Sequence, residues 1–144
     1  MSYGLRSYQQ TRTKAASRED ILIMLYEGAI RFLERSIGEF ENGKLGDHKT
    51  YLSRGRAIVE EFQNTLDWES GGEITIQLND LYTHILDGLT EANMKQDMEP
   101  VRRAIIILGT LLDGWRGAVK SVKEGVGEER PPEDDPGASV AVKL

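Results

Sequence analysis

Apolar residues recur every three or four positions over four long stretches of the chain, which is the spacing of one face of an α-helix. The stretches cover about 18–41, 48–68, 74–95 and 98–123. Short polar, glycine-containing connections such as "ENGKLGD" and "ESGGE" separate them. Long helices with short connections pack as antiparallel neighbours, so the pattern predicts an all-α fold, an antiparallel up-down four-helix bundle.

Several polar residues stand where helices are expected to begin. Ser17 is a good N-cap, and Asp20 occupies the capping-box position three residues later. Asp47 is expected to cap the second helix and Asp97 the fourth. Pro100 then falls in a first turn, where its missing amide donor is not needed.

Three of the helices show an ordinary apolar stripe. For the second helix we expect Tyr51, Leu52, Ile58, Val59, Phe62 and Leu66 to form the core face. For the third we expect Leu78, Leu81, Tyr82, Ile85, Leu86, Leu89 and Ala92. For the fourth we expect Val101, Ala104, Ile105, Leu108, Leu111, Leu112, Trp115, Val119 and Val122.

The first helix carries more apolar surface than one face can hide. In "LIMLYEGAIRFLERS" (22–36) the apolar residues cover an arc of roughly 200°, whereas a surface helix usually shows a stripe of about 100° or a little more. Ile23 and Ile30 lie at one edge of the arc, and Met24 lies beyond the other. The excess indicates a surface for a binding partner.

Two other helices also place apolar residues away from the core. Ile76 and Met94 project nearly opposite the stripe of the third helix, and Ile106 points away from the stripe of the fourth. Gly28 lies inside the first helix, where close approach of another helix or simple tolerance explains it equally well. Exposed apolar grooves accept the apolar faces of amphipathic segments, so a site for partner helices is favoured.

Composition narrows the class of protein. The 144 residues are enough for one domain, and the chain contains no cysteine. The formal net charge of −6 argues against a nucleic-acid partner. We expect residues 1–16 to be an extended segment, 17–124 the bundle, and the acidic, proline-rich 125–144 a disordered tail. No apolar run suits a signal peptide or a membrane span, so we expect a cytoplasmic protein without membrane insertion.

The sequence offers little catalytic chemistry. His84 shares the outward face of the third helix with Asp80, Asp87 and Glu91, which is a conceivable metal site but more simply a solvated polar face. The Glu-x-x-His pairs that dimetal bundle sites require do not occur at either histidine, His48 included. We expect no catalytic, metal or cofactor site.

Four collinear segments resemble the flagellar secretion chaperones of the FliS family. They are "MLYEGAIRFL" (24–33), with "AAS" and the tyrosine of "SYQQT" upstream, "RAIVEEFQNTLDWESGGEITIQLNDLY" (56–82), "LTEANMKQD" (89–97) and "LLDGWRGAV" (111–119). The resemblance covers roughly residues 8–122 in the right order.

The resemblance implies a non-enzymatic four-helix bundle that binds the disordered C-terminal region of flagellin in the cytosol. It also implies that binding prevents premature polymerisation and assists delivery to the flagellar type III export apparatus, with an export gate component as a further partner. Tyr8 matches a family element that can lie over the bundle near the client surface. The candidate client contacts are Tyr8, Ile23, Met24, Gly28, Ile30, Ile76, Met94 and Ile106.

Two alternatives remain open at the level of sequence. The first is a general helical adaptor or regulatory protein that binds another amphipathic helix through the same kind of surface. The second is a bundle enzyme carrying a metal or cofactor, which a stoichiometric metal or a chromophore in the purified protein would reveal.

Overall fold

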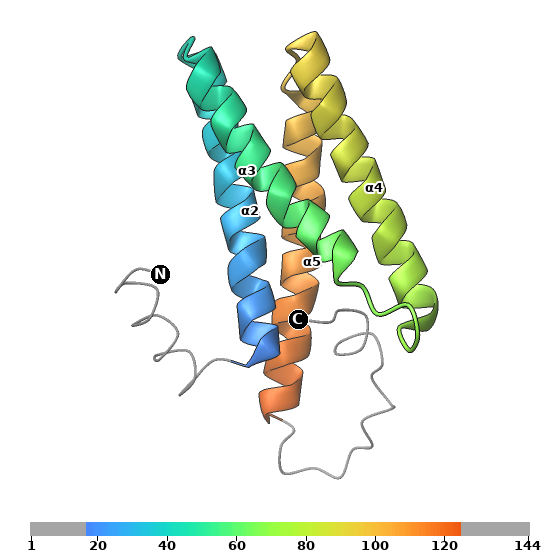
Figure 1. Cartoon of the computed structure of the whole chain (residues 1–144). Coiled ribbons are helices and arrows are strands. Elements are labelled where there is room, and N and C mark those ends of the chain that lie inside the picture. The colour runs from blue at the N-terminus through green and yellow to red at the C-terminus, as the bar shows by residue number, and fades with distance from the viewer. Residues whose placement is uncertain (1–16, 125–144) are drawn as a thin grey trace, which may run out of the picture.

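The computed structural model describes residues 17–124, with side chains for 17–121. Its helices are α2 (Arg18–Glu41), α3 (Leu45–Asn64), α4 (Gly72–Lys95) and α5 (Glu99–Glu124) (Figure 1). Helix α2 packs beside α3 and α5, and α4 packs beside the same two helices. The predicted all-α, up-down four-helix bundle is therefore confirmed. The expected N-terminal segment and C-terminal tail lie outside the described residues.

The predicted capping box at the start of α2 is present. The Asp20 amide donates to Ser17 Oγ at 3.2 Å, and the Ser17 amide donates to Asp20 Oδ2 at 3.1 Å. These two bonds satisfy amide groups that the first helical turn leaves without a partner.

Helix α3 begins three residues earlier than expected, so the assignment of Asp47 as its N-cap is wrong. Gly43 adopts a φ of +76°, and the Lys44 amide donates to the Glu39 carbonyl oxygen. This turn closes directly after α2 and lets the next helix start at Leu45. The Asp47 carboxylate lies in the first turn, where it still suits the positive end of the helix.

Helix α3 also ends four residues earlier than expected. Its C-terminal turn is followed by a loop held by Asp67, whose carboxylate accepts hydrogen bonds from the backbone amides of Glu69 and Ser70. The Asp67 carbonyl oxygen accepts a bond from Thr75 Oγ1 of α4 at 2.9 Å. Side-chain bonds of Asp and Ser to nearby backbone compete with helix continuation, which explains the early stop.

The start of α5 follows the prediction within one residue. The Asp97 carboxylate accepts the amide of Glu99 at 3.0 Å, while the Met98 carbonyl oxygen accepts the first helical bond, from the Arg102 amide. Met98 therefore holds the cap position itself. Pro100 lies in the first turn, as predicted.

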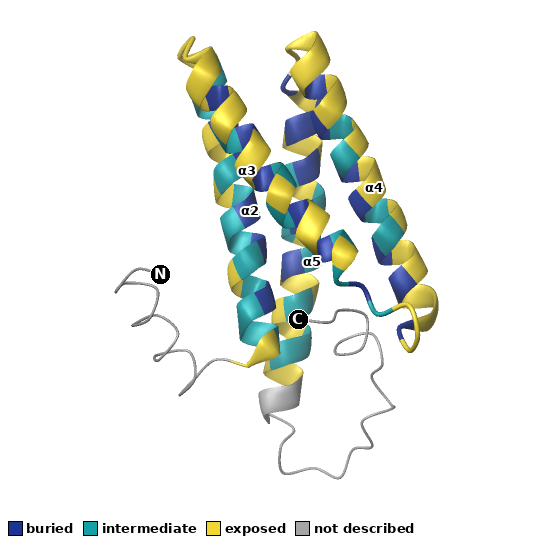
Figure 2. Cartoon of the chain, in the orientation of Figure 1, coloured by how far each residue is buried: buried dark blue, intermediate teal, exposed yellow. Residues whose placement is uncertain are grey.

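The inward faces of the helices form one apolar core (Figure 2). The predicted stripes supply it, and every expected core residue with a described side chain is buried or partly buried. Helices α2 and α3 pack closely at Gly55, where an added Cβ would meet Leu33 Cδ2 at 2.6 Å. Only glycine permits this approach of the two helices.

A buried polar contact crosses the centre of the core. The hydroxyl groups of Tyr26 on α2 and Tyr82 on α4 are hydrogen-bonded to each other at 2.5 Å. The Phe62 ring of α3 stacks on Tyr26 with a centroid distance of 4.4 Å and lies 5.7 Å from the Tyr82 ring. Burial raises the pKa of Tyr26 to about 12, and burial together with the neighbouring Tyr26 also raises the pKa of Tyr82.

A second buried polar group was not expected from the sequence. The His48 side chain is fully buried, and its Nδ1 lies 2.9 Å from the Ser36 carbonyl oxygen, to which it donates. The Phe40 ring meets the imidazole edge-on at 5.2 Å. His48 thus links the start of α3 to the end of α2.

We expect single phenylalanine substitutions of the buried tyrosine pair to be more harmful than the double substitution. Tyr26→Phe or Tyr82→Phe leaves one buried hydroxyl without its partner, which costs about 1–3 kcal/mol. Tyr26→Phe/Tyr82→Phe removes both polar groups and should recover most of that loss. Urea unfolding of the four proteins measures this coupling, and strictly additive losses would contradict it.

The raised pKa values predict a loss of stability at alkaline pH. Well below pH 10, the ordinary pKa of tyrosine, both buried rings are neutral in the folded and the unfolded chain, and stability is fully present. Between pH 10 and about 12 the unfolded chain ionises while folded Tyr26 stays neutral, so the free energy of unfolding falls. Urea unfolding at stepped pH should show a steeper fall for the wild type than for the double phenylalanine variant.

Candidate binding surface

The broad apolar arc of α2 serves two neighbouring helices. Ile23 and Ile30 are partly buried and pack against the core cluster. On the α3 side, the Phe32 ring stacks with Tyr51 at a centroid distance of 6.2 Å. A helix packed between two neighbours needs apolar residues on both flanks, so most of the arc is used inside the bundle.

Three predicted contact residues are strongly exposed. The exposed fractions are 53% for Ile76, 77% for Met94 and 66% for Ile106. Ile76 and Met94 share one face of α4 but lie eighteen residues apart, which is about 27 Å along a helix. They mark two ends of a long surface and are not members of one compact patch.

The remaining predicted contacts lie in other surroundings. Met24 is 36% exposed on α2. At Gly28 an added Cβ would lie 3.7 Å from Ile58 Cδ1, an ordinary contact distance, so packing inside the bundle does not demand glycine there. Tyr8 lies outside the described residues.

Three further exposed apolar side chains, Leu45, Trp68 and Ile74, were not expected from the sequence. Trp68 is 58% exposed and lies in the α3–α4 connection, although the sequence placed it at the end of a helix. Ile74 lies in the first turn of α4, at the same end of the bundle. The signal that could have located Trp68 is the neighbouring "DWES", because Asp and Ser side chains favour turns over helix.

The seam between α3 and α4 is polar. Arg56 Nη2 donates to the Leu86 carbonyl oxygen at 2.9 Å, and the same group bonds to Thr90 Oγ1. Farther along, Gln63 Nε2 donates to Asn79 Oδ1 at 2.9 Å. A groove of about 310 Å³ follows this seam, lined by Lys49, Leu52, Ser53, Arg56, Leu89, Thr90 and Asn93. Long polar side chains bridge these helices, in contrast to the close apolar contact of α2 with α3.

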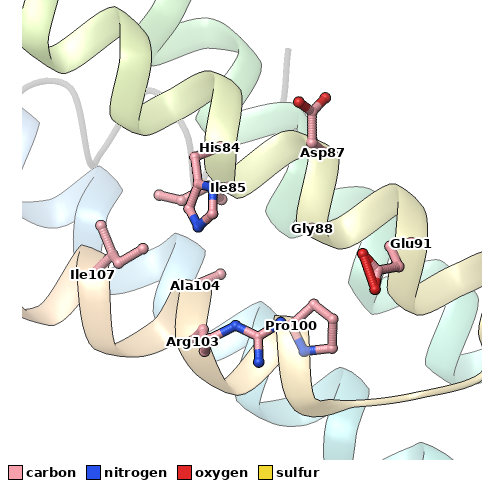
Figure 3. Close-up of a pocket in the computed structure, with 9 residues that line it drawn as sticks. All are labelled: His84, Ile85, Asp87, Gly88, Glu91, Pro100, Arg103, Ala104 and Ile107. Atoms are coloured by element: carbon pink, nitrogen blue, oxygen red, sulfur yellow. The ribbon is translucent and has the colours of Figure 1, made fainter.

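A smaller recess of about 170 Å³ lies between α4 and α5 (Figure 3). Its floor is apolar and includes Ile85 and Ala104, and its rim carries His84, Glu91 and Arg103. Asp87 also lines the recess, which therefore carries two carboxylates and one guanidinium group. Within residues 17–121 no group of three or more metal-ligating side chains comes together, and the candidate set around His84 is not assembled.

None of the helices α2 to α5 is long and apolar enough to cross a bilayer.

Sequence comparison assigns the chain to a family. A family model described as flagellar protein FliS matches residues 1–122. The chain belongs to the FliS family. The match spans α2, α3, α4 and α5 as far as residue 122, and it leaves out the residues from 123 onward.

Named relatives agree with this assignment. A flagellar secretion chaperone FliS from Campylobacter jejuni is 33% identical over 110 residues, covering 76% of this chain and 86% of the relative. The flagellar secretion chaperone FliS of Salmonella typhimurium is 27% identical over 118 residues, covering 78% and 87%. That of Bacillus subtilis is 23% identical over 118 residues, covering 82% and 87%.

Gly28 of α2 and Gly55 of α3 should respond oppositely to alanine. Gly28→Ala should raise the free energy of unfolding by up to about 1 kcal/mol, because the methyl group fits and alanine favours helix. Gly55→Ala is the matched control and should lower it by about 1–3 kcal/mol, because Leu33 must move. Urea unfolding distinguishes them, and a clear loss of stability in Gly28→Ala would contradict the packing described.

Proposed function

We propose that this protein is a cytosolic export chaperone for flagellin. It binds the disordered C-terminal region of flagellin, prevents premature polymerisation, and assists delivery to the flagellar type III export apparatus, where a gate component is a further partner. Membership of the FliS family over residues 1–122 carries the proposal. The relatives named flagellar secretion chaperones support it.

The exposed apolar residues of α4 and α5 fit such a client. An assembly-competent client helix presents an apolar stripe, and seating that stripe on the chaperone replaces the contact that drives polymerisation. Ile76, Met94 and Ile106 offer apolar contacts spread over a long surface. Ordering a disordered client costs several kcal/mol of the gross interaction energy, so a broad interface wrapping the bundle is required. The proposed role is binding, with no chemical step.

Calorimetric titration with a peptide covering the last forty or so residues of the cognate flagellin tests the proposal. We expect saturable one-to-one binding with a negative heat-capacity change, the mark of apolar burial. Absence of heat and of co-elution with the peptide would contradict flagellin as client. Binding of a different amphipathic helix in its place would favour the general adaptor.

Paired glutamate substitutions locate the surface. Ile76→Glu should weaken peptide binding at least tenfold, because it places a charge in an apolar contact. Gln77 is the exposed neighbour of Ile76 and points away from the face that Ile76 shares with Met94, so Gln77→Glu adds the same charge but should change binding less than threefold. Ile106→Glu tests α5 in the same way. All three should melt within a few degrees of wild type, because the replaced side chains are exposed. Equal effects of Ile76→Glu and Gln77→Glu would remove Ile76 from the interface.

Substitution of Ile30 gives a less direct test. Its side chain packs against the core, so a charge there should lower stability as well as binding. Gly28→Ala is better suited to α2, because it preserves the bundle. If the client approaches α2 closely at this point, the added methyl group should weaken peptide binding while the protein becomes more stable.

A further inference from the structure

Arginine and aromatic side chains gather on the outer junction of α2 and α3. The Arg35 guanidinium lies 4.7 Å from the centroid of the Tyr51 ring, and that of Arg54 lies 5.6 Å from the same ring. Arg54 also lies 5.9 Å from the Phe32 ring. Arg31 lies one turn before Arg35 on α2. We call these five residues the arginine patch.

The three arginines of the patch are exposed and lack carboxylate partners among residues 17–121. Other arginines of the bundle behave differently, since Arg102 pairs with Glu41 and Arg116 with Glu27. Three unneutralised cations on one face are notable in a chain of net charge −6. Stacked guanidinium groups on aromatic rings suit a ligand with carboxylates and flat apolar groups.

The chain itself contains a segment with that chemistry. Residues 125–144 include five acidic side chains, three prolines and only two basic side chains. Within it, "RPPEDDP" (130–136) places three carboxylates between prolines. Proline-rich segments bind aromatic-lined surfaces, and arginine clusters recognise acidic motifs, so this stretch complements the patch in both respects. It also lies outside the part matched by the family model.

The geometry of the bundle limits which part of the tail can reach the patch. The ion pairs of α2 with α5 set the two helices antiparallel, so that α5 ends level with the start of α2. Residues 31–35 then lie about 18–24 Å farther along the bundle, and Arg35 lies on the side of α2 that meets Tyr51 of α3. A path of roughly 30 Å needs about nine extended residues beyond Glu124. Glu133, Asp134 and Asp135 meet that length, whereas Glu128 and Glu129 fall short of it.

We propose that the acidic stretch 133–135 of the C-terminal tail docks in cis on the arginine patch of α2 and α3. Its carboxylates pair with Arg31, Arg35 and Arg54, and its flanking prolines pack on the rings of Phe32 and Tyr51. The interaction is chiefly electrostatic and therefore weakens with salt. It places the tail on the α2–α3 side and leaves Ile106 of α5 uncovered.

Paramagnetic relaxation in the full chain tests the proposal. The sequence has no cysteine, so Ser139→Cys gives a single site for a nitroxide label near the docking stretch. We expect selective broadening of the amides of residues 31–35 and 51–54, lost in 0.5 M salt. Adding Asp134→Asn/Asp135→Asn should reduce this broadening at least fivefold, and Arg35→Gln/Arg54→Gln should do the same from the other side.

The matched control is Glu128→Gln/Glu129→Gln, which removes the same charge from acidic residues too close to α5 to reach the patch. It should change the broadening less than twofold. The proposal would be overturned if Glu128→Gln/Glu129→Gln reduced the broadening as much as Asp134→Asn/Asp135→Asn does. Broadening spread evenly over the bundle, or centred on α4, would also overturn it. In a mixture of nitroxide-labelled chains and isotope-enriched chains without nitroxide, the patch amides of the enriched chains should not broaden. Broadening of those amides would mean that the tail docks on a second chain, and would overturn docking in cis.

Discussion

The hydrogen bond between Tyr26 and Tyr82 crosses the bundle between α2 and α4, the two helices that face each other diagonally. Both hydroxyls are deeply buried, so each depends on the other to avoid an unsatisfied polar group. The Phe62 ring of α3 packs against both tyrosines. These contacts therefore constrain the axial position and the rotation of α2, α3 and α4 relative to one another. The other core residues of each helix then face inward in the same register.

The contact between α2 and α3 differs in character from the contact between α3 and α4. Helices α2 and α3 approach closely through Gly55 and bury apolar side chains, whereas α3 and α4 are bridged by Arg56 and Gln63. Close apolar packing resists separation, while a seam of half-exposed hydrogen bonds opens at lower free energy. The bundle thus combines one tightly packed helix pair with one seam that opens more easily.

Surface chemistry is divided in a similar way. The exposed apolar side chains Ile76, Met94 and Ile106 lie on α4 and α5, and the arginine patch lies on α2 and α3. The first group suits the apolar stripe of an amphipathic helix, and the second suits carboxylates. The two surfaces therefore share no side chain.

The sequence by itself determined the four helices, the capping box at Ser17 and the core stripes, because these depend on spacing and on neighbours within a few residues. It also identified the outward placement of Ile76, Met94 and Ile106. Tertiary structure decided how the flanks of α2 are used, since periodicity cannot say that a helix lies between two neighbours. It likewise decided the burial of His48 and the contacts of Arg35 with Tyr51 and of Arg54 with Phe32, because these contacts join residues on different helices whose relative rotation only packing sets.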